Sequence, residues 1–219
     1  MGGSGVPTTT GVREPTSAPT ARLWGRHIAL MLLGPVSLAI AGSRHPAYLN
    51  ADTADSWHTL HVVLLVLFPL LAATVWVLVR RWWSGLDGLV ATAARMLALA
   101  YAVFYGALDV LAGIANGAIV RDAASGGGDV AAPRLELFRQ GDMLGAVGTW
   151  SLLGAFALTA VLYLRHHGIA AVPGSVVLLA AAYSFRTSHV FPWRGVVTML
   201  AFGVGALLLA LPELRHPPA

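Results

Sequence analysis

One acidic residue, Asp109, stands inside an apolar run, residues 95–117, that is long enough to cross a membrane. An ionisable side chain at bilayer depth costs at least about 2.5 to 3.5 kcal/mol, so it is usually turned into a bundle or cavity and marks a functional site. In its neutral form a buried carboxyl donates a proton, which makes Asp109 a candidate general acid. The alternative interpretation is a packing seam with one internally hydrogen-bonded carboxyl.

Polar and aromatic residues share a helical face with Asp109. At about 100° per residue, Arg95, Tyr105 and Asn116 lie close to the same line along the helix, and Tyr101 lies at its edge. Electron-rich ring faces attract cations, so a protonated acid among aromatic rings suits a carbocation reaction on an isoprenoid. The catalytic candidates are Asp109, Tyr105 and Tyr101, and the substrate-binding candidates are Asn116, Trp57, Phe185 and Trp193.

Three histidines form a second group of candidates. His58 and His61 begin one expected helix three residues apart, and His189 follows another helix on the same expected side. Neutral imidazoles bind transition metals, and a carboxylate (Asp52, Asp55, Glu136 or Asp142) would complete the shell. His61 and His189 are also the one pair suited to haem ligation. The alternative is three interfacial histidines that bind loops or lipid headgroups.

The composition is that of a polytopic membrane protein. Hydrophobic residues make up 57% of the chain, charged residues 11%, and the mean hydropathy is +0.70, whereas soluble domains carry about 25% charged residues. The chain has no lysine and no cysteine, which excludes Schiff bases, thiolate nucleophiles, Fe–S clusters and c-type haem. Its net charge of +4 comes from scattered arginines, a pattern that does not indicate nucleic-acid binding.

The candidate residues must be positioned by helices, and the hydropathy predicts an all-α bundle of about six transmembrane helices in one domain, residues 21–219. Residues 1–20, which are rich in Gly, Thr and Pro, are predicted to form a disordered tail. The expected helices are 28–41, 57–79, 89–120, 143–164, 169–183 and 195–211, and residues 121–142 are expected to form a flexible loop. We expect an uncleaved first helix, both termini in the cytoplasm, and a location in the plasma or inner membrane. A cavity is expected between the second, third and sixth helices.

In size, in all-helical hydropathy and in its membrane-buried acid among aromatic residues, the chain is similar to the small non-canonical membrane terpene cyclases of meroterpenoid and indole-terpenoid pathways. The resemblance covers the whole hydrophobic region and implies that Asp109 protonates an alkene or epoxide of a prenyl chain. The fungal members have seven spans, whereas six are expected here. The DDxxD and DxDD motifs of soluble cyclases are absent, so magnesium-dependent ionisation of a diphosphate is not expected.

The leading expectation is therefore a membrane enzyme without a cofactor that cyclises a prenyl or terpenoid chain. Its expected partners are a hydrophobic small molecule or lipid substrate and the bilayer itself. One alternative is a protein of redox or metal handling in which histidines hold a metal ion or haem. The other is an accessory membrane subunit without enzymatic activity.

Overall fold

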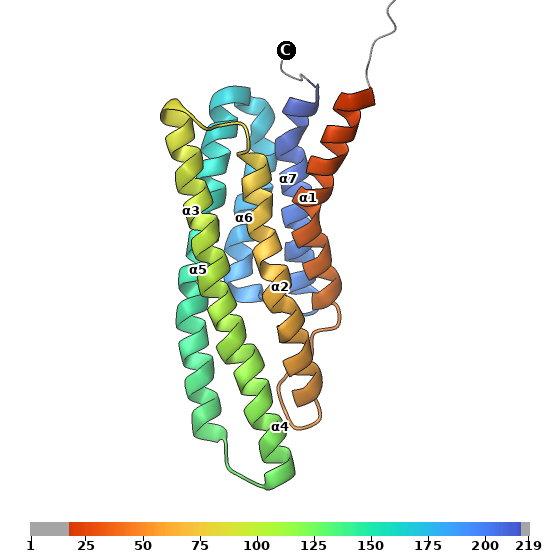
Figure 1. Ribbon diagram of the computed structural model, residues 1–219, viewed down its shortest axis with the longest axis vertical. Helices are drawn as coiled ribbons and strands as arrows, with labels where there is room; N and C mark the ends of the chain where they lie inside the picture. Colours follow the sequence, from red (N-terminus) through yellow and green to blue (C-terminus); the bar gives the residue numbers. More distant parts are fainter. Residues whose placement is uncertain (1–17, 216–219) are drawn as a thin grey trace, which may run out of the picture.

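The computed structural model describes residues 18–215, and the side chains of residues 24–213, and it is helical throughout apart from short connections (Figure 1). The helices are α1 (Ala18–Gly42), α2 (Ala54–Leu78), α3 (Gly85–Leu108), a π-helical segment η1 (Asp109–Ala115), α4 (Asn116–Gly126), α5 (Ala131–His167), a 3₁₀ turn η2 (Gly168–Ala171), α6 (Val172–Ser188) and α7 (Arg194–Arg215). Most of the expected tail, residues 1–17, lies outside the described residues, and residues 18–20 already belong to α1.

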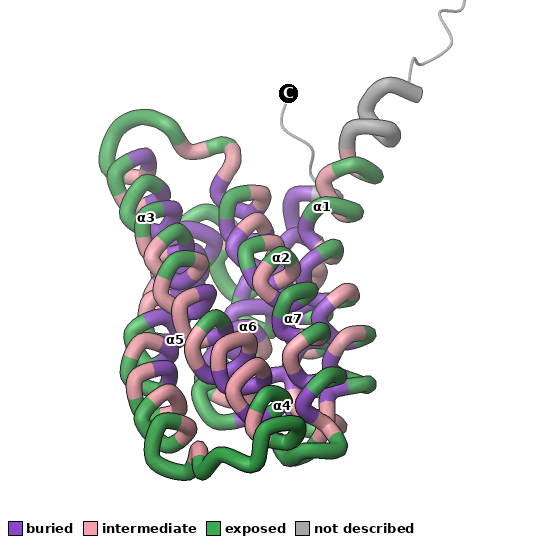
Figure 2. Tube along the Cα trace, turned by 60° about the horizontal axis from the view of Figure 1, so that its bottom comes forward, coloured by how far each residue is buried: buried purple, intermediate pink, exposed green. Residues whose placement is uncertain are grey.

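Five segments of the described chain are long and apolar enough to cross a membrane: Trp24–Gly42, Ala54–Leu78, Gly85–Gly126, Ala131–Ser188 and Arg194–Glu213. Large apolar side chains on the outside of the helices are largely exposed, as at Val66 and Val103. Figure 2 shows this pattern, with buried positions facing inward and exposed positions facing outward. An apolar exterior of this kind suits contact with lipid, so the prediction of an all-α, multi-pass membrane bundle is confirmed.

The segment 131–188 contains two helices, because the chain reverses at η2. The Arg186 guanidinium near the end of α6 lies 4.1 Å from the centre of the Trp150 ring on α5. These two residues are nearly equidistant from Gly168 along the sequence, so α5 and α6 are antiparallel neighbours (Figure 1).

Residues 121–142, expected as a loop, are almost entirely helical. The α4 helix continues to Gly126 and is capped by Gly127, whose φ of 73° is a left-handed conformation suited to glycine. The α5 helix begins at Ala131, whose N–H donates to Asp129 Oδ1 at 2.9 Å. At 1.5 Å per residue α5 is roughly 55 Å long, well beyond the ~30 Å of a bilayer core. The α4–α5 hairpin therefore projects past the α6–α7 turn (Figure 1).

The helix that carries Asp109 is packed closely against α5. On α5, a Cβ at Gly148 would lie 2.9 Å from the backbone nitrogen of Tyr105, so only glycine permits this approach. Small residues allow membrane helices to pack with their backbones close together. The polar face of α3 is consequently enclosed, and Arg95, Tyr101, Tyr105 and Asp109 are all buried.

Candidate functional site

Three histidines from three separate parts of the chain converge at the end of the bundle where α2 begins and α6 ends. His45 lies on the connection between α1 and α2, His61 lies on α2, and His189 directly follows α6. One potential ligand atom of each ring lies within 4.8 Å of the others. The ring centroids are 5.1 Å apart for His45 and His61, 5.5 Å for His45 and His189, and 6.0 Å for His61 and His189.

Each imidazole in this histidine triad is fixed through its Nδ1 atom. His45 Nδ1 lies 2.7 Å from the carbonyl oxygen of Pro46, and His61 Nδ1 lies 2.7 Å from that of Trp57. A carbonyl only accepts hydrogen bonds, so both Nδ1 atoms carry the proton and both Nε2 atoms keep a free lone pair. His189 Nδ1 lies 2.6 Å from the Tyr105 hydroxyl. Metal-binding histidines are commonly oriented by such a bond from the second ring nitrogen.

The α6–α7 turn places His189 by means of an unusual backbone. His189 has a φ of 44° and Trp193 a φ of 66°, conformations that cost free energy in residues other than glycine and that cluster at functional sites. Val190 between them is fully buried. A Cβ at Gly42, at the end of α1, or at Gly195, at the start of α7, would overlap the Val190 backbone. The turn is thus held against the end of α1, three residues before His45.

Asp109 lies beside the triad and has no hydrogen-bond partner among the described residues. Its side chain is 0% exposed, and neither carboxylate oxygen has a hydrogen-bond partner among the described residues. Its Oδ1 lies 3.9 Å from His61 Nε2, the nitrogen that keeps its lone pair. His45 Nε2 is likewise buried without a partner. Buried polar atoms are nearly always satisfied, so this group of unpartnered atoms marks a candidate binding site.

Asp109 begins the π-helical segment η1, and this segment fits around His61. A Cβ at Gly113 would overlap the His61 ring, so glycine is required for the helix to pass this close. The indole N–H of Trp57 donates to the Ala112 carbonyl oxygen at 3.2 Å, and the backbone N–H of Asn116 bonds to the Gly113 and Leu111 carbonyls instead. Single π-helical turns are frequent at functional sites because they alter the direction of side chains and free carbonyl groups.

A cavity of about 480 Å³ opens beside the triad. It is lined by residues of α2, α3, η1, α5, the end of α6 and the following turn: Trp57, His61, Tyr105, Leu108, Ala112, Phe138, Asp142, Gly145, Ala146, Thr149, Phe185, Arg186, Thr187, His189 and Phe191. The expectation of a cavity between the second, third and sixth predicted helices is corrected, because α7 contributes none of these residues. The α5 and α6 helices pack on that side and supply the wall.

The cavity wall includes some of the residues that the sequence singled out and not others. Tyr105, Trp57, Phe185, His61 and His189 line it. Asp109, Tyr101 and Asn116 are fully buried and are not part of the wall. Trp193 is 81% exposed and does not line the cavity. His58 packs against α4, where a Cβ at Gly117 would lie 3.0 Å from the His58 Cβ, and it is not part of the triad.

The two triad members outside the candidate spans are kept neutral by their surroundings. Burial lowers the pKa of His45 below its ordinary value, and the bond to the Pro46 carbonyl opposes this only in part. Burial, followed by the proximity of His45 and His61, lowers the pKa of His189 well below its ordinary value. Neutral imidazole is the form that binds a metal ion, so the triad is prepared for a cation.

The triad suits a small metal ion better than haem. An ion with Zn–N bonds of about 2.0 to 2.1 Å holds tetrahedral ligands roughly 3.4 Å apart, so rings whose ligand atoms lie within 4.8 Å would close by about 1 Å. Ligation of haem by the pair His61 and His189 would require the two imidazoles on opposite faces of a porphyrin. The His61 and His189 rings are instead nearly parallel, at 12°, and His45 packs edge-on against both of them.

The sequence reasoning missed His45 because this residue lies in a polar connection, outside any helical pattern. One available signal was that it falls on the same expected side as His61 and His189. The resemblance to membrane terpene cyclases receives no support from sequence or structure comparison. No protein-family model, curated protein or solved structure matches the chain.

Proposed function

We propose that the protein is a multi-pass membrane enzyme in which His45, His61 and His189 hold a divalent transition-metal ion beside a cavity for a hydrophobic substrate. The observation that carries this proposal is the convergence of three imidazoles, two of them buried and that of His189 half-buried, whose Nδ1 atoms are already engaged. Structural packing alone does not require His45 Nε2 and both Asp109 carboxylate oxygens to be buried without a hydrogen-bond partner among the described residues.

Zinc is the first metal to expect, because three nitrogen ligands with one position left for water or substrate are typical of catalytic zinc. Such an ion supplies Lewis-acid chemistry or an activated water molecule. His61 and His189 reach the cavity wall, whereas Asp109 lies behind it. We therefore assign Asp109 as the anionic partner of the ion, and not as a group that touches the substrate. Tyr105 lines the cavity and orients His189.

The proposed topology has six crossings, with α5 and α6 as separate spans and with the start of α1 and the end of α7 both on the cytoplasmic side. Support comes from the antiparallel pairing of α5 and α6 and from the position of the start of α1 and the end of α7 at the same end of the molecule (Figure 1). Arg80 and Arg81 lie at this end near Glu213, and basic residues near helix ends favour the cytoplasmic side. The triad then lies toward the opposite face of the membrane.

Metal content tests the proposal directly. The purified chain should retain or bind one zinc ion in elemental analysis and competition titration, and His45→Gln, His61→Gln and His189→Gln should each lower the affinity by more than the 10- to 100-fold typical of second-shell changes. His58→Gln is the matched control, since His58 lies on the same helix as His61 but outside the triad. If zinc, copper, iron, nickel and cobalt all fail to bind, or if His58→Gln is as damaging as His61→Gln, the proposal is wrong.

Acid-initiated cyclisation of a prenyl chain by Asp109 is a second candidate function. It is favoured by the unpartnered carboxyl and by the aromatic rings of Tyr105 and Phe185, whose centroids are 4.8 Å apart beside the cavity. The position of Asp109 behind the wall weighs against direct protonation of a substrate. Chelation separates the two candidates, because turnover of a prenylated substrate by Asp109 would survive metal removal, whereas a metal-dependent reaction would stop.

A further inference from the structure

We propose that the substrate of this cavity is an amphiphile with an anionic head group, which enters between α5 and α6 and is held by Arg186. This inference rests on the proposed function, because it names the substrate class of the same site. The starting observation is the position of the four well-exposed lining residues. Asp142 and Ala146 belong to α5, and Arg186 and Thr187 belong to the end of α6, so the mouth of the cavity lies between these two helices.

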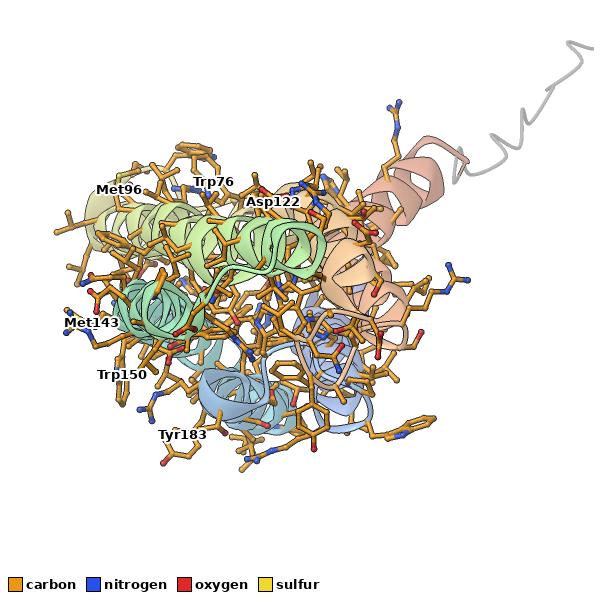
Figure 3. The ribbon with its side chains drawn as sticks, turned by 90° about the horizontal axis from the view of Figure 1, so that it is seen from below. Trp76, Met96, Asp122, Met143, Trp150 and Tyr183 are labelled. Atoms are coloured by element: carbon orange, nitrogen blue, oxygen red, sulfur yellow. The ribbon has the colours of Figure 1, made fainter. Side chains whose placement is uncertain are left out.

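The mouth opens on a side of the bundle that is suited to the membrane surface. Trp150 on α5 and Tyr183 on α6 are 51% and 62% exposed, and Figure 3 shows both side chains projecting outward from neighbouring helices on the same side. Exposed tryptophan and tyrosine are typical of the interface between lipid and water. An amphiphile could therefore pass from the bilayer into the cavity with its chain still in apolar surroundings.

Arg186 is held at this mouth without an anionic partner. Its guanidinium lies 4.1 Å from the centre of the Trp150 ring and 5.4 Å from that of Tyr183, which fixes the side chain but leaves its N–H donors free. Some described arginines bind carboxylates, as Arg80 binds Glu213 and Arg165 binds Asp87. No such ion pair involves Arg186 within residues 24–213. A guanidinium that lines a cavity in this state suits a phosphate or carboxylate.

The interior of the cavity is mainly apolar, whereas its mouth carries charged side chains. Beyond Arg186 and Asp142 the wall consists mainly of apolar and aromatic residues, among them Leu108, Phe138 and Phe185. This division between a polar rim and an apolar interior matches a molecule with a charged head and a hydrocarbon body. Asp142 lies on the same rim and repels an anion, so the head group is placed toward the α6 side.

The spacing along the chain brings the head group close to the triad. Arg186 precedes His189 by three residues, and both line the same cavity. A head group held by Arg186 therefore shares this cavity with a member of the triad, which favours reaction near the head over reaction in the distal part of the chain. The structure thus assigns reaction at or beside the anionic group.

Binding of dodecyl phosphate to the chelator-treated full chain in a neutral detergent, followed by native mass spectrometry, tests this inference. We expect one saturable adduct per chain, with dodecanol bound at least about tenfold more weakly. Arg186→Gln should weaken dodecyl phosphate binding at least about tenfold, and Arg186→Lys should have a smaller effect because it keeps the charge but not the planar fork. Asp142→Asn should strengthen binding.

The matched control is Arg139→Gln, which removes another exposed arginine, on α5, that does not line the cavity and whose partners at Glu136 do not line it either. Laurate serves as a carboxylate probe, and binding stronger or weaker than that of dodecyl phosphate decides which head group is preferred within the anionic class. Equal binding of dodecanol and dodecyl phosphate, or unchanged binding by Arg186→Gln, would overturn the inference. Because the protein is metal-free here, this result is independent of whether zinc binds, and thermal unfolding of Arg186→Gln in detergent reports on its fold.

Discussion

Tyr101 and Tyr105 lie one helical turn apart, and only the Tyr105 hydroxyl is positioned to orient a histidine of the triad. Tyr101 and Tyr105 are both buried on α3, but only Tyr105 reaches the triad, with its hydroxyl 2.6 Å from His189 Nδ1. The Tyr101 hydroxyl has no hydrogen-bond partner among the described residues. Substitution by phenylalanine therefore removes a bond that orients His189 when it is made at Tyr105, but removes only a hydroxyl without a hydrogen-bond partner among the described residues when it is made at Tyr101.

We expect Tyr105→Phe to lower zinc affinity by about 10- to 100-fold, the usual effect of losing a second-shell bond, while the protein stays folded because the ring remains. Tyr101→Phe should leave the affinity unchanged. Competition titration with a chromophoric chelator measures both, and thermal unfolding in detergent checks the fold. Equal affinities in the two variants would show that the Tyr105 hydroxyl does not orient a metal ligand.

At the level of single residues, the sequence indicated the neighbourhood of the site but not its full membership. An acid in an apolar run must be buried, and so Asp109 was identifiable from the energetic cost alone. His61 and His189 were identifiable from residue type. His45 was not, because the position of a connecting segment depends on tertiary packing, and here that segment is fixed by the contact of Val190 with Gly42. His58 differs from His61 only in the helix face that it occupies.

Among the elements, the π-helical segment η1 is the one that most directly shapes the site. It begins at Asp109, offers the Ala112 carbonyl to Trp57, and passes His61 so closely that residue 113 must be glycine. Gly106, on the same continuous helix, is a useful comparison, because a Cβ there would meet only Leu65 Cδ1 at an ordinary 3.5 Å.

Gly113→Ala should displace the His61 ring and lower zinc affinity by at least about tenfold, with a stability cost of about 1 to 3 kcal/mol from overpacking. Gly106→Ala should bind zinc normally and be as stable or slightly more stable, since alanine favours helix by about 1 kcal/mol over glycine. Zinc titration and thermal unfolding of both variants measure these effects. The assignment of η1 as a support for His61 fails if Gly113→Ala binds zinc as tightly as Gly106→Ala.

The sequence predicted where helices cross the membrane better than where they end. Apolar runs mark the crossings, because the bilayer selects for them. The expected helices 28–41, 143–164 and 195–211 lie within observed helices, 57–79 runs one residue past α2, and 89–120 and 169–183 each cover a continuous helical stretch of more than one element. Residues 121–142 were expected as a loop because hydropathy detects only lipid-facing helix. The polar extension of α5 is instead supported by local bonds, as Glu136 accepts from Arg139 at 2.7 Å and from Gln140 at 2.7 Å. Nothing in the apolar pattern distinguishes the π-helical turn from ordinary helix.

For the whole molecule, the site lies where one end of the bundle is covered by parts of the chain that leave the membrane. A small apolar cluster of Leu49, Ala54, Trp57 and Val120, with Phe138 and Phe191 packed against it, joins the α1–α2 connection to the α4–α5 hairpin next to the triad. This cover separates the histidines from water on that side. The proposed access for a hydrophobic molecule is therefore between α5 and α6, where the exposed lining residues of the cavity lie.

The whole arrangement depends on α5 and α6 crossing the membrane separately, and the chain allows a clean test because it contains no cysteine. Single cysteines would be introduced at Ser84 and Ile169, at the α2–α3 and α5–α6 connections, and at Gly128 and Pro192, at the α4–α5 and α6–α7 connections. In intact cells a membrane-impermeant maleimide should label Gly128→Cys and Pro192→Cys, whereas Ser84→Cys and Ile169→Cys should react only after the membrane is opened.

The expected labelling pattern follows from the length of α6 as well as from its packing against α5. The 17 residues of α6 span roughly 26 Å at 1.5 Å per residue, close to the ~30 Å bilayer core, and η2 extends the segment at its start. If Ile169→Cys reacts together with Gly128→Cys and Pro192→Cys, then α5 and α6 form a re-entrant pair and do not cross. If Ser84→Cys and Ile169→Cys are the two that react in intact cells, the crossings stand but the orientation is reversed, and the triad faces the cytoplasm.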